Sequence, residues 1–195
     1  KEFNVTCHYC IVGCGYKAST WPTNKQGSTA PGVTPVMSTV TLANAGNTYN
    51  GGTTFYAGSL VLGASSTGAA GAVTQGPLGV GSLSVQAVNF DRADNPLLTA
   101  ASGVSIANAI NLNSDLNVGG STSFALSGAI TSFLNGNGEM AELYKVGSGT
   151  LTLSGANSFS GGGIYIQEGS VTFANAAAVG GGALEFGFSP SSPSA

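Results

Sequence analysis

Three cysteines near the N-terminus are the residues whose types and spacing most clearly indicate chemistry. Cys7, Cys10 and Cys14 follow the pattern C-x2-C-x3-C, and no cysteine comes after them. Thiolates at this spacing can converge on one metal ion or iron–sulfur cluster, because short turns bring the sulfurs within bonding reach. Gly13 and Gly15 flank the third cysteine and would let the backbone pass close to a bulky cluster. The sequence therefore predicts Cys7, Cys10 and Cys14 as candidate metal ligands.

Other states of these cysteines are also compatible with the sequence. They could be free thiols, or one disulfide and one remaining thiol, or zinc ligands. His8, the sole histidine, could join them around zinc, but neighbouring residues of a strand point to opposite faces. A disulfide framework for the whole fold is excluded, because residues 15–195 contain no cysteine.

The residues on both sides of the cysteines are similar to those of a known protein family. The stretch NVTCHYCIVGCGY, continuing to TWPTNKQGSTAP, resembles the N-terminal iron–sulfur region of the arsenite oxidase large subunit over residues 4–32. The resemblance implies that Cys7, Cys10 and Cys14 are ligands of a [3Fe-4S] cluster. We expect no molybdenum chemistry, because that family needs a very much longer chain to hold its pterin. We further expect the isolated protein to carry no cofactor, with the [3Fe-4S] cluster as the alternative.

The chain changes character after this segment. The N-terminal part holds three of the five basic residues and the only tryptophan, and Pro31 and Pro35 separate it from the first alternating apolar run. We divide the chain into a cysteine-containing segment at 1–37, a repeat domain at 38–188 and a Ser/Pro tail at 189–195. The tail, SPSSPSA, cannot continue a strand ladder.

The composition of the remainder favours short strands joined by many turns. The chain has 31 glycines and only 7% charged residues, and glycine, asparagine and serine supply turns. A net charge of −3 argues against a nucleic-acid partner, which would require a clustered basic face. No apolar run reaches the roughly 18 residues of a membrane-spanning helix, and no signal peptide pattern begins the chain.

One stretch of sequence occurs twice. Residues 39–62 read TVTLANAGNTYNGGTTFYAGSLVL, and residues 149–173 read GTLTLSGANSFSGGGIYIQEGSVTF. Each copy places an alternating strand, an Asn/Gly-rich turn and another strand in sequence, and a glycine-led strand follows at 81–85 and at 182–186. Such self-similarity predicts a β-solenoid.

Alternating apolar residues indicate which side chains face the core of this solenoid. Residues 104–118, VSIANAINLNSDLNV, place their aliphatic residues mostly at even spacing, which predicts strands and excludes a helix. The expected inward residues of the two repeats are Leu60, Leu62, Leu151, Leu153, Val171 and Phe173.

Charged residues of the repeat domain offer few catalytic arrangements. Glu139, Glu142 and Lys145 are expected to face water; a Glu139–Glu142 acid–base pair would need both carboxylates to line a cleft. The cluster of Asp91, Arg92 and Asp94 predicts a surface loop, or else a contact or cation site. A Ser-His-Asp triad is not expected, because the sole histidine lies in the other segment.

Residues 39–187 resemble the passenger-associated repeats of autotransporter-type surface proteins. The residues that carry this resemblance are NTYNGGTTFYAGSLVLG, KVGSGTLTLSGANSFSGG and NLNSDLNVGGSTSFALSGAI. The resemblance implies a mainly β fold, a right-handed parallel β-helix, secreted to the bacterial cell surface, with the periplasm as the alternative location. It implies no catalytic residues.

These observations predict a non-enzymatic extracellular structural or adhesive β-solenoid. The alternative is an iron–sulfur or metal-binding electron-transfer protein, an arsenite oxidase-like oxidoreductase fragment. A solenoid polysaccharide hydrolase is disfavoured because the eight acidic residues are thinly spread. We expect copies to associate into homo-oligomers or filaments through the solenoid ends or the N-terminal segment, because unpaired strand edges promote pairing.

Overall fold

A computed structural model describes residues 2–6, 15–19, 39–86 and 95–187. All of the regular structure in these residues is β, in nineteen strands, and no helix occurs among them. The prediction of a mainly β fold is therefore confirmed. The expected boundary near Met37, the Ser/Pro tail from 189 and the loop that holds Asp91, Arg92 and Asp94 lie outside the described residues.

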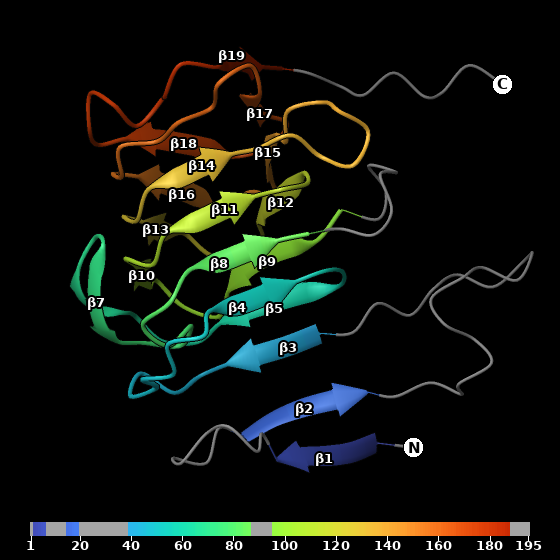
Figure 1. The fold of residues 1–195 in the computed structure, drawn as a ribbon, viewed down its shortest axis with the longest axis vertical. Helices are drawn as coiled ribbons and strands as arrows, with labels where there is room; N and C mark the ends of the chain where they lie inside the picture. The colour runs from blue at the N-terminus through green and yellow to red at the C-terminus, as the bar shows by residue number, and fades with distance from the viewer. Residues whose placement is uncertain (1, 7–14, 20–38, 87–94, 188–195) are drawn as a thin grey trace, which may run out of the picture.

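Three parallel sheets form the body of the molecule (Figure 1). The largest contains β3 (Thr39–Leu42), β5 (Ser59–Leu62), β9 (Leu97–Ala100), β12 (Leu116–Gly119), β15 (Leu143–Val146), β17 (Gly163–Ile166) and β19 (Ala183–Phe186). The second contains β4 (Thr53–Phe55), β8 (Leu83–Val85), β11 (Ile110–Leu112) and β14 (Ile130–Ser132). The third contains β10 (Ser105–Ile106), β13 (Phe124–Leu126), β16 (Thr150–Leu153) and β18 (Ser170–Phe173).

From β10 to β15 the chain visits the three sheets in rotation, so that each turn adds one strand to each sheet; the turns before β10 and after β15 each add strands to only two of the sheets. Strands β10, β11 and β12 form one such rung, and β13, β14 and β15 form the next. In-register partners in successive rungs are separated by 20 residues where the corners are shortest, as for Ile110 with Ile130 and Gly163 with Ala183. This arrangement is a β-solenoid, in which each rung contacts only its neighbours.

Two antiparallel hairpins stand apart from the three sheets. Strands β6 (Thr67–Ala69) and β7 (Ala72–Gln75) pair within the stretch 63–79, in which small residues predominate. Strands β1 (Glu2–Thr6) and β2 (Gly15–Ser19) pair at the N-terminal end.

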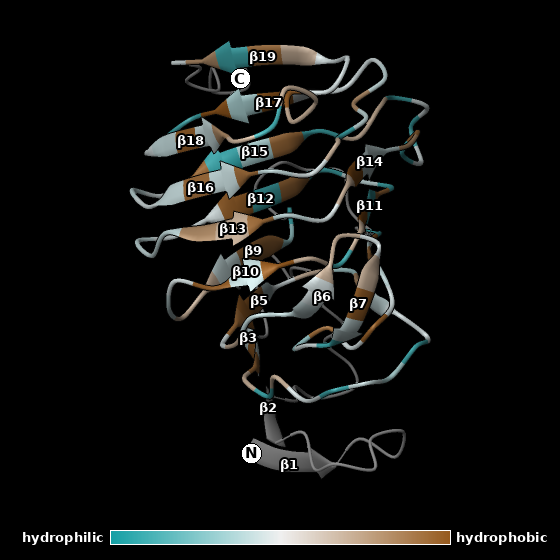
Figure 2. Ribbon diagram, turned by 90° about the vertical axis from the view of Figure 1, so that its left-hand side faces the viewer, coloured by the Kyte–Doolittle hydropathy of each residue, from teal (hydrophilic) through white to brown (hydrophobic). Residues whose placement is uncertain are grey.

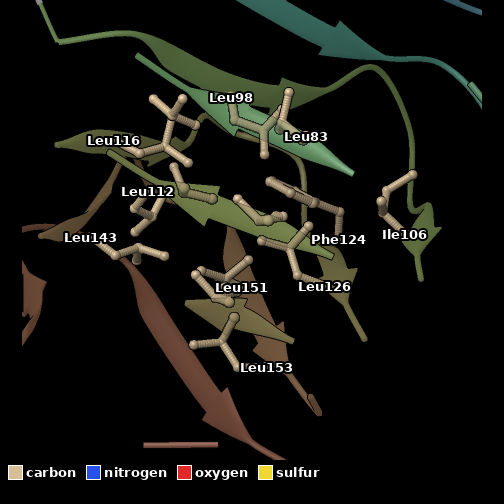
Figure 3. Close-up of a cluster of buried hydrophobic side chains, with 14 of the residues drawn as sticks. Leu83, Leu98, Ile106, Leu112, Leu116, Phe124, Leu126, Leu143, Leu151 and Leu153 are labelled. Carbon is tan, nitrogen blue, oxygen red and sulfur yellow. The ribbon is translucent and has the colours of Figure 1, made fainter. Parts of the chain in front are cut away.

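The core of the solenoid is formed by alternate side chains of its strands. The leucines expected to face inward, Leu60, Leu62, Leu151 and Leu153, are all buried. Figure 3 shows Leu151 and Leu153 together with Leu126, Leu143 and other aliphatic side chains in one cluster. Val171 and Phe173 also point toward this cluster, but they are only partly buried because β18 is the last strand of its sheet.

The two sequence repeats adopt equivalent strand pairings. In the first copy β3 pairs with β5 and β4 with β8; in the second β16 pairs with β18 and β17 with β19. However, β3 and β5 belong to the seven-stranded sheet, whereas β16 and β18 belong to a four-stranded sheet. The second copy therefore starts one face further around the solenoid, because a short strand, a turn and an alternating apolar pattern suit any of the three faces.

Candidate functional site

The predicted cysteine site lies outside the described residues. Cys7, Cys10 and Cys14 fall in the segment 7–14, between β1 and β2. The antiparallel pairing of these strands ends at Thr6 opposite Gly15, so the two residues that flank this segment in the sequence are neighbours across the hairpin. The assignment of the three cysteines as metal ligands remains a prediction, as does any role of His8.

This hairpin lies at the N-terminal end of the solenoid. Strand β2 runs beside β3, the first strand of the seven-stranded sheet, and Figure 1 places the hairpin below the rungs, whose stacking Figure 2 shows from another side. The two strands that flank the cysteine segment in the sequence therefore lie at one end of the solenoid.

The described part of the repeat domain offers no alternative metal centre. No group of three or more His, Cys, Asp or Glu among the described residues is placed to hold a metal ion. Likewise, no helix in this part of the chain is long and apolar enough to cross a membrane.

Glu139 and Glu142 occupy different environments. Glu139 is exposed in the turn between Leu134 and Met140, where its backbone N–H bonds the Asn135 side chain at 3.0 Å. Glu142 is half-buried and accepts a hydrogen bond from the Tyr144 hydroxyl. The Glu142 backbone N–H also donates to Asp115 at 3.0 Å. Glu139 therefore lies at the surface in a turn, whereas Glu142 is half-buried beside Tyr144.

Tyr144 and Tyr165 add an aromatic contact on the same sheet. The two residues are register partners on β15 and β17, and their rings stack with centroids 5.2 Å apart. Such offset stacking stabilises neighbouring rungs by roughly 0.5–1.5 kcal/mol beyond burial of the ring area.

Lys145 contradicts the prediction that it faces water, because only 1% of its surface is exposed. It shares the inward face of β15 with Leu143, and its register partners Val118 and Ile166 belong to or pack on the core. Its ammonium group donates to the carbonyl oxygens of Val146 (2.9 Å), Gly147 (2.5 Å) and Glu168 (3.1 Å). The sequence signal was available: Lys145 takes the position that Val118 and Ile166 take in the neighbouring rungs.

Burial also changes the ionisation of this lysine. Removal of the ammonium group from water lowers the pKa of Lys145 from its ordinary value of 10.5, and the nearby Glu168 charge partly opposes this shift. No sequence motif indicates a buried cation with three carbonyl acceptors; only the alternation along β15 indicates that the Lys145 side chain points inward.

The C-terminal rung presents an apolar surface. Leu184 is 38% exposed and Phe186 is 77% exposed, whereas their counterparts Ile164 and Ile166 on β17 are buried or partly buried. Strands β18 and β19 are the last of their sheets among the described residues, so each has one edge without a partner strand there. Apolar side chains beside such edges favour addition of another strand.

Comparisons with known proteins match two separate parts of the chain. Residues 7–50 match the family described as Rieske 3Fe-4S, and residues 143–185 match the family described as passenger-associated-transport-repeat. A stretch of 30 residues is 53% identical to arsenite oxidase subunit AioA of Herminiimonas arsenicoxydans, which is 15% of this chain and 4% of that protein. No solved structure matches the chain. The chain thus combines a segment similar to Rieske 3Fe-4S proteins with a β-solenoid that is similar to the passenger-associated-transport-repeat over residues 143–185.

Proposed function

We propose that this protein is a non-enzymatic extracellular β-solenoid, a surface passenger or self-assembling fibre subunit with a structural or adhesive role. The observation that carries the proposal is the stack of parallel rungs from β3 to β19, which includes the passenger-associated repeat at 143–185. Such passengers are right-handed parallel β-helices, and the proposal assigns that hand to this solenoid. The bacterial cell surface is the proposed location, with the periplasm as the alternative.

Labelling of the bacterial cells that produce the protein tests the location. Antibodies against residues 39–187 should stain intact cells, and external protease should remove the stain. Staining that appears only after the outer membrane is permeabilised would indicate the periplasm. Staining that requires lysis of the inner membrane would contradict the proposal.

Self-association is the second part of the proposal, through the solenoid ends or the N-terminal segment. The exposed Leu184 and Phe186 at the C-terminal rung supply the apolar contact, and the edges of β18 and β19 supply backbone donors and acceptors. The low charge content of the chain offers little repulsion against such contact.

Light scattering across a concentration series tests this association. The Phe186→Lys variant should associate more weakly than the unmodified protein, because it places a charge on the exposed apolar end. Tyr56→Lys is the matched control, since Tyr56 is 51% exposed but precedes β5, away from the last rung. Equal association of both variants would exclude the C-terminal rung as the contact.

An iron–sulfur electron-transfer protein is the second candidate function. The match of residues 7–50 to Rieske 3Fe-4S supports it, and Cys7, Cys10 and Cys14 would hold the cluster. The pairing of Thr6 with Gly15 holds the two residues that flank the cysteine segment side by side. We rank this function second because the match to Rieske 3Fe-4S covers only residues 7–50, whereas the stack of parallel rungs runs from β3 to β19.

Replacement of single cysteines tests the second candidate. If a cluster is bound, Cys7→Ser, Cys10→Ser and Cys14→Ser should each remove visible absorption from anaerobically purified protein. Variants that leave the spectrum unchanged would exclude those cysteines as cluster ligands.

A further inference from the structure

The corner that holds the Lys145 ammonium group surrounds it with backbone acceptors, as a cation-binding site does. Three backbone carbonyl oxygens, from Val146, Gly147 and Glu168, lie 2.5–3.1 Å from the lysine nitrogen. A lysine ammonium carries three N–H donors and no acceptor, so three acceptors match it completely. The carbonyl oxygens come from two successive rungs, the corner after β15 and the corner after β17.

Glycines shape this corner. Gly147 and Gly169 have φ values of +71° and +73°, which side-chain-bearing residues rarely adopt. A Cβ atom on Gly169 would lie 2.8 Å from the lysine nitrogen. The backbone therefore turns its carbonyl groups toward the ammonium and leaves room for it.

The stem of Lys145 reaches this corner through the core. Only 1% of the surface of Lys145 is exposed. Its register partners in the rungs on either side are Val118 and Ile166. An aliphatic residue would fill the stem's space but would leave the carbonyl groups of Gly147 and Glu168 without this donor. Gly147 is half-buried and Glu168 is exposed, so the loss of the ammonium donor is costly to the extent that the buried side of this corner keeps water from replacing it.

We propose that the corners after β15 and β17 form a backbone binding site for a primary ammonium ion, which the Lys145 side chain fills and thereby ties two successive rungs together. The site takes primary ammonium groups because they carry three donors in a compact head. A guanidinium group is planar and larger, and a quaternary ammonium ion has no N–H donor at all.

The direct test is chemical rescue of the Lys145→Ala variant at neutral pH. The truncation removes three carbons and the nitrogen, which are the heavy atoms of n-propylammonium. The melting temperature of the variant should fall by about 5 °C or more relative to the unmodified protein. It should rise again in a saturable manner with n-propylammonium chloride, as expected for a ligand that binds only the folded state.

Three controls separate the ammonium site from simpler effects. The unmodified protein reports general effects of the salt, and Leu153→Ala reports the filling of an ordinary core cavity. Propanol has the shape of the ligand without its charge, and tetramethylammonium has the charge without the donors. Rescue of Lys145→Ala by propanol to the same extent, or a rise no larger than that of Leu153→Ala, would overturn the proposal.

If Lys145→Ala does not fold in any of these solutions, the Lys145→Met variant tests the proposed ammonium site instead. Lys145→Met keeps most of the stem's volume and removes the ammonium group. It should melt at a lower temperature than the unmodified protein, because the carbonyl groups lose their donor. A Lys145→Met variant at least as stable as the unmodified protein would show that only the stem matters, and would overturn the proposal.

Discussion

At the scale of single residues, burial of alternate side chains determines what a substitution costs. Leu153 is fully buried on β16, whereas Thr172 is exposed on the adjacent β18. Leu153→Ala should lower the free energy of unfolding by roughly 2–5 kcal/mol, because it removes apolar atoms and leaves a cavity. Thr172→Ala should change it by less than about 0.5 kcal/mol. Denaturant titrations of both variants check this, and equal effects would mean that the core is misplaced.

The burial of Lys145 predicts how the free energy of unfolding depends on pH. Burial lowers the pKa of Lys145 in the folded protein, while the unfolded chain has the ordinary value of 10.5. Between these two values the unfolded chain binds more protons, so the free energy of unfolding should rise with pH in the window that ends at 10.5.

The Lys145→Met variant isolates this contribution, because methionine does not titrate. The unmodified protein should gain stability relative to Lys145→Met as the pH approaches 10.5 from below. Denaturant titrations of both proteins at a series of pH values measure the difference. A relative loss of stability over the same window would mean that the three carbonyl groups raise the pKa more than burial lowers it.

The sequence could not place Lys145 by residue type, because lysines are almost never fully buried without partners. The partners here are backbone carbonyl groups, whose positions depend on how two corners stack. Alternation along β15 did place Leu143 correctly, and the same alternation applied to Lys145 would have placed it inward. The prediction that Lys145 faces water followed its residue type, whereas the alternation along β15 indicates the inward position that the structure shows.

At the scale of elements, the buried asparagines at the corners connect one rung to the next. Asn157 accepts a hydrogen bond from the Ile130 backbone N–H at 2.9 Å and donates to the Ala178 carbonyl oxygen at 2.6 Å. Asn47, its equivalent in the first repeat, donates to the Pro77 carbonyl oxygen at 3.2 Å. The sequence repeat had matched these two asparagines, and the structure supplies the reason for the match.

Removal of this amide should be costly. Asn157→Ala leaves a buried donor and a buried acceptor without their partner, so it should lower the free energy of unfolding by roughly 2–4 kcal/mol. Asn175→Ala is the control, because Asn175 is exposed and its hydrogen bonds compete with water. Thermal melts of both variants compare the two, and an equal shift would show that Asn157 does not link the rungs.

The alternation of apolar residues predicts which segments form strands, but it does not predict which sheet each strand joins. Short alternating runs such as residues 104–118 predicted strands correctly, and these became β10, β11 and β12 on three different sheets. The pattern does not record which face a strand occupies, because all three faces bury the same kinds of side chain. That is why the two repeats could be matched in sequence while their different sheets could not be foreseen.

At the scale of the whole molecule, the sequence predicted one solenoid preceded by a segment of different character. The strand order confirms the solenoid, because local turns and alternation act within each rung, and the shortest rungs have only 20 residues. The exposure of Leu184 and Phe186 was not predicted residue by residue, since it depends on which strand is last in its sheet. The metal-ligand role of Cys7, Cys10 and Cys14 stays a prediction, as these residues lie outside the described part of the chain.

We propose that the protein acts as a surface solenoid and not as an iron–sulfur electron carrier. A visible absorption spectrum of anaerobically purified protein, with iron and labile sulfide assays on the same sample, tests it most directly. We expect no visible absorption band and no stoichiometric iron, because a short segment beside a glycine-rich solenoid gives a cluster little apolar cover. About three iron atoms per chain, with matching sulfide and visible absorption, would contradict the claim and make electron transfer the first candidate.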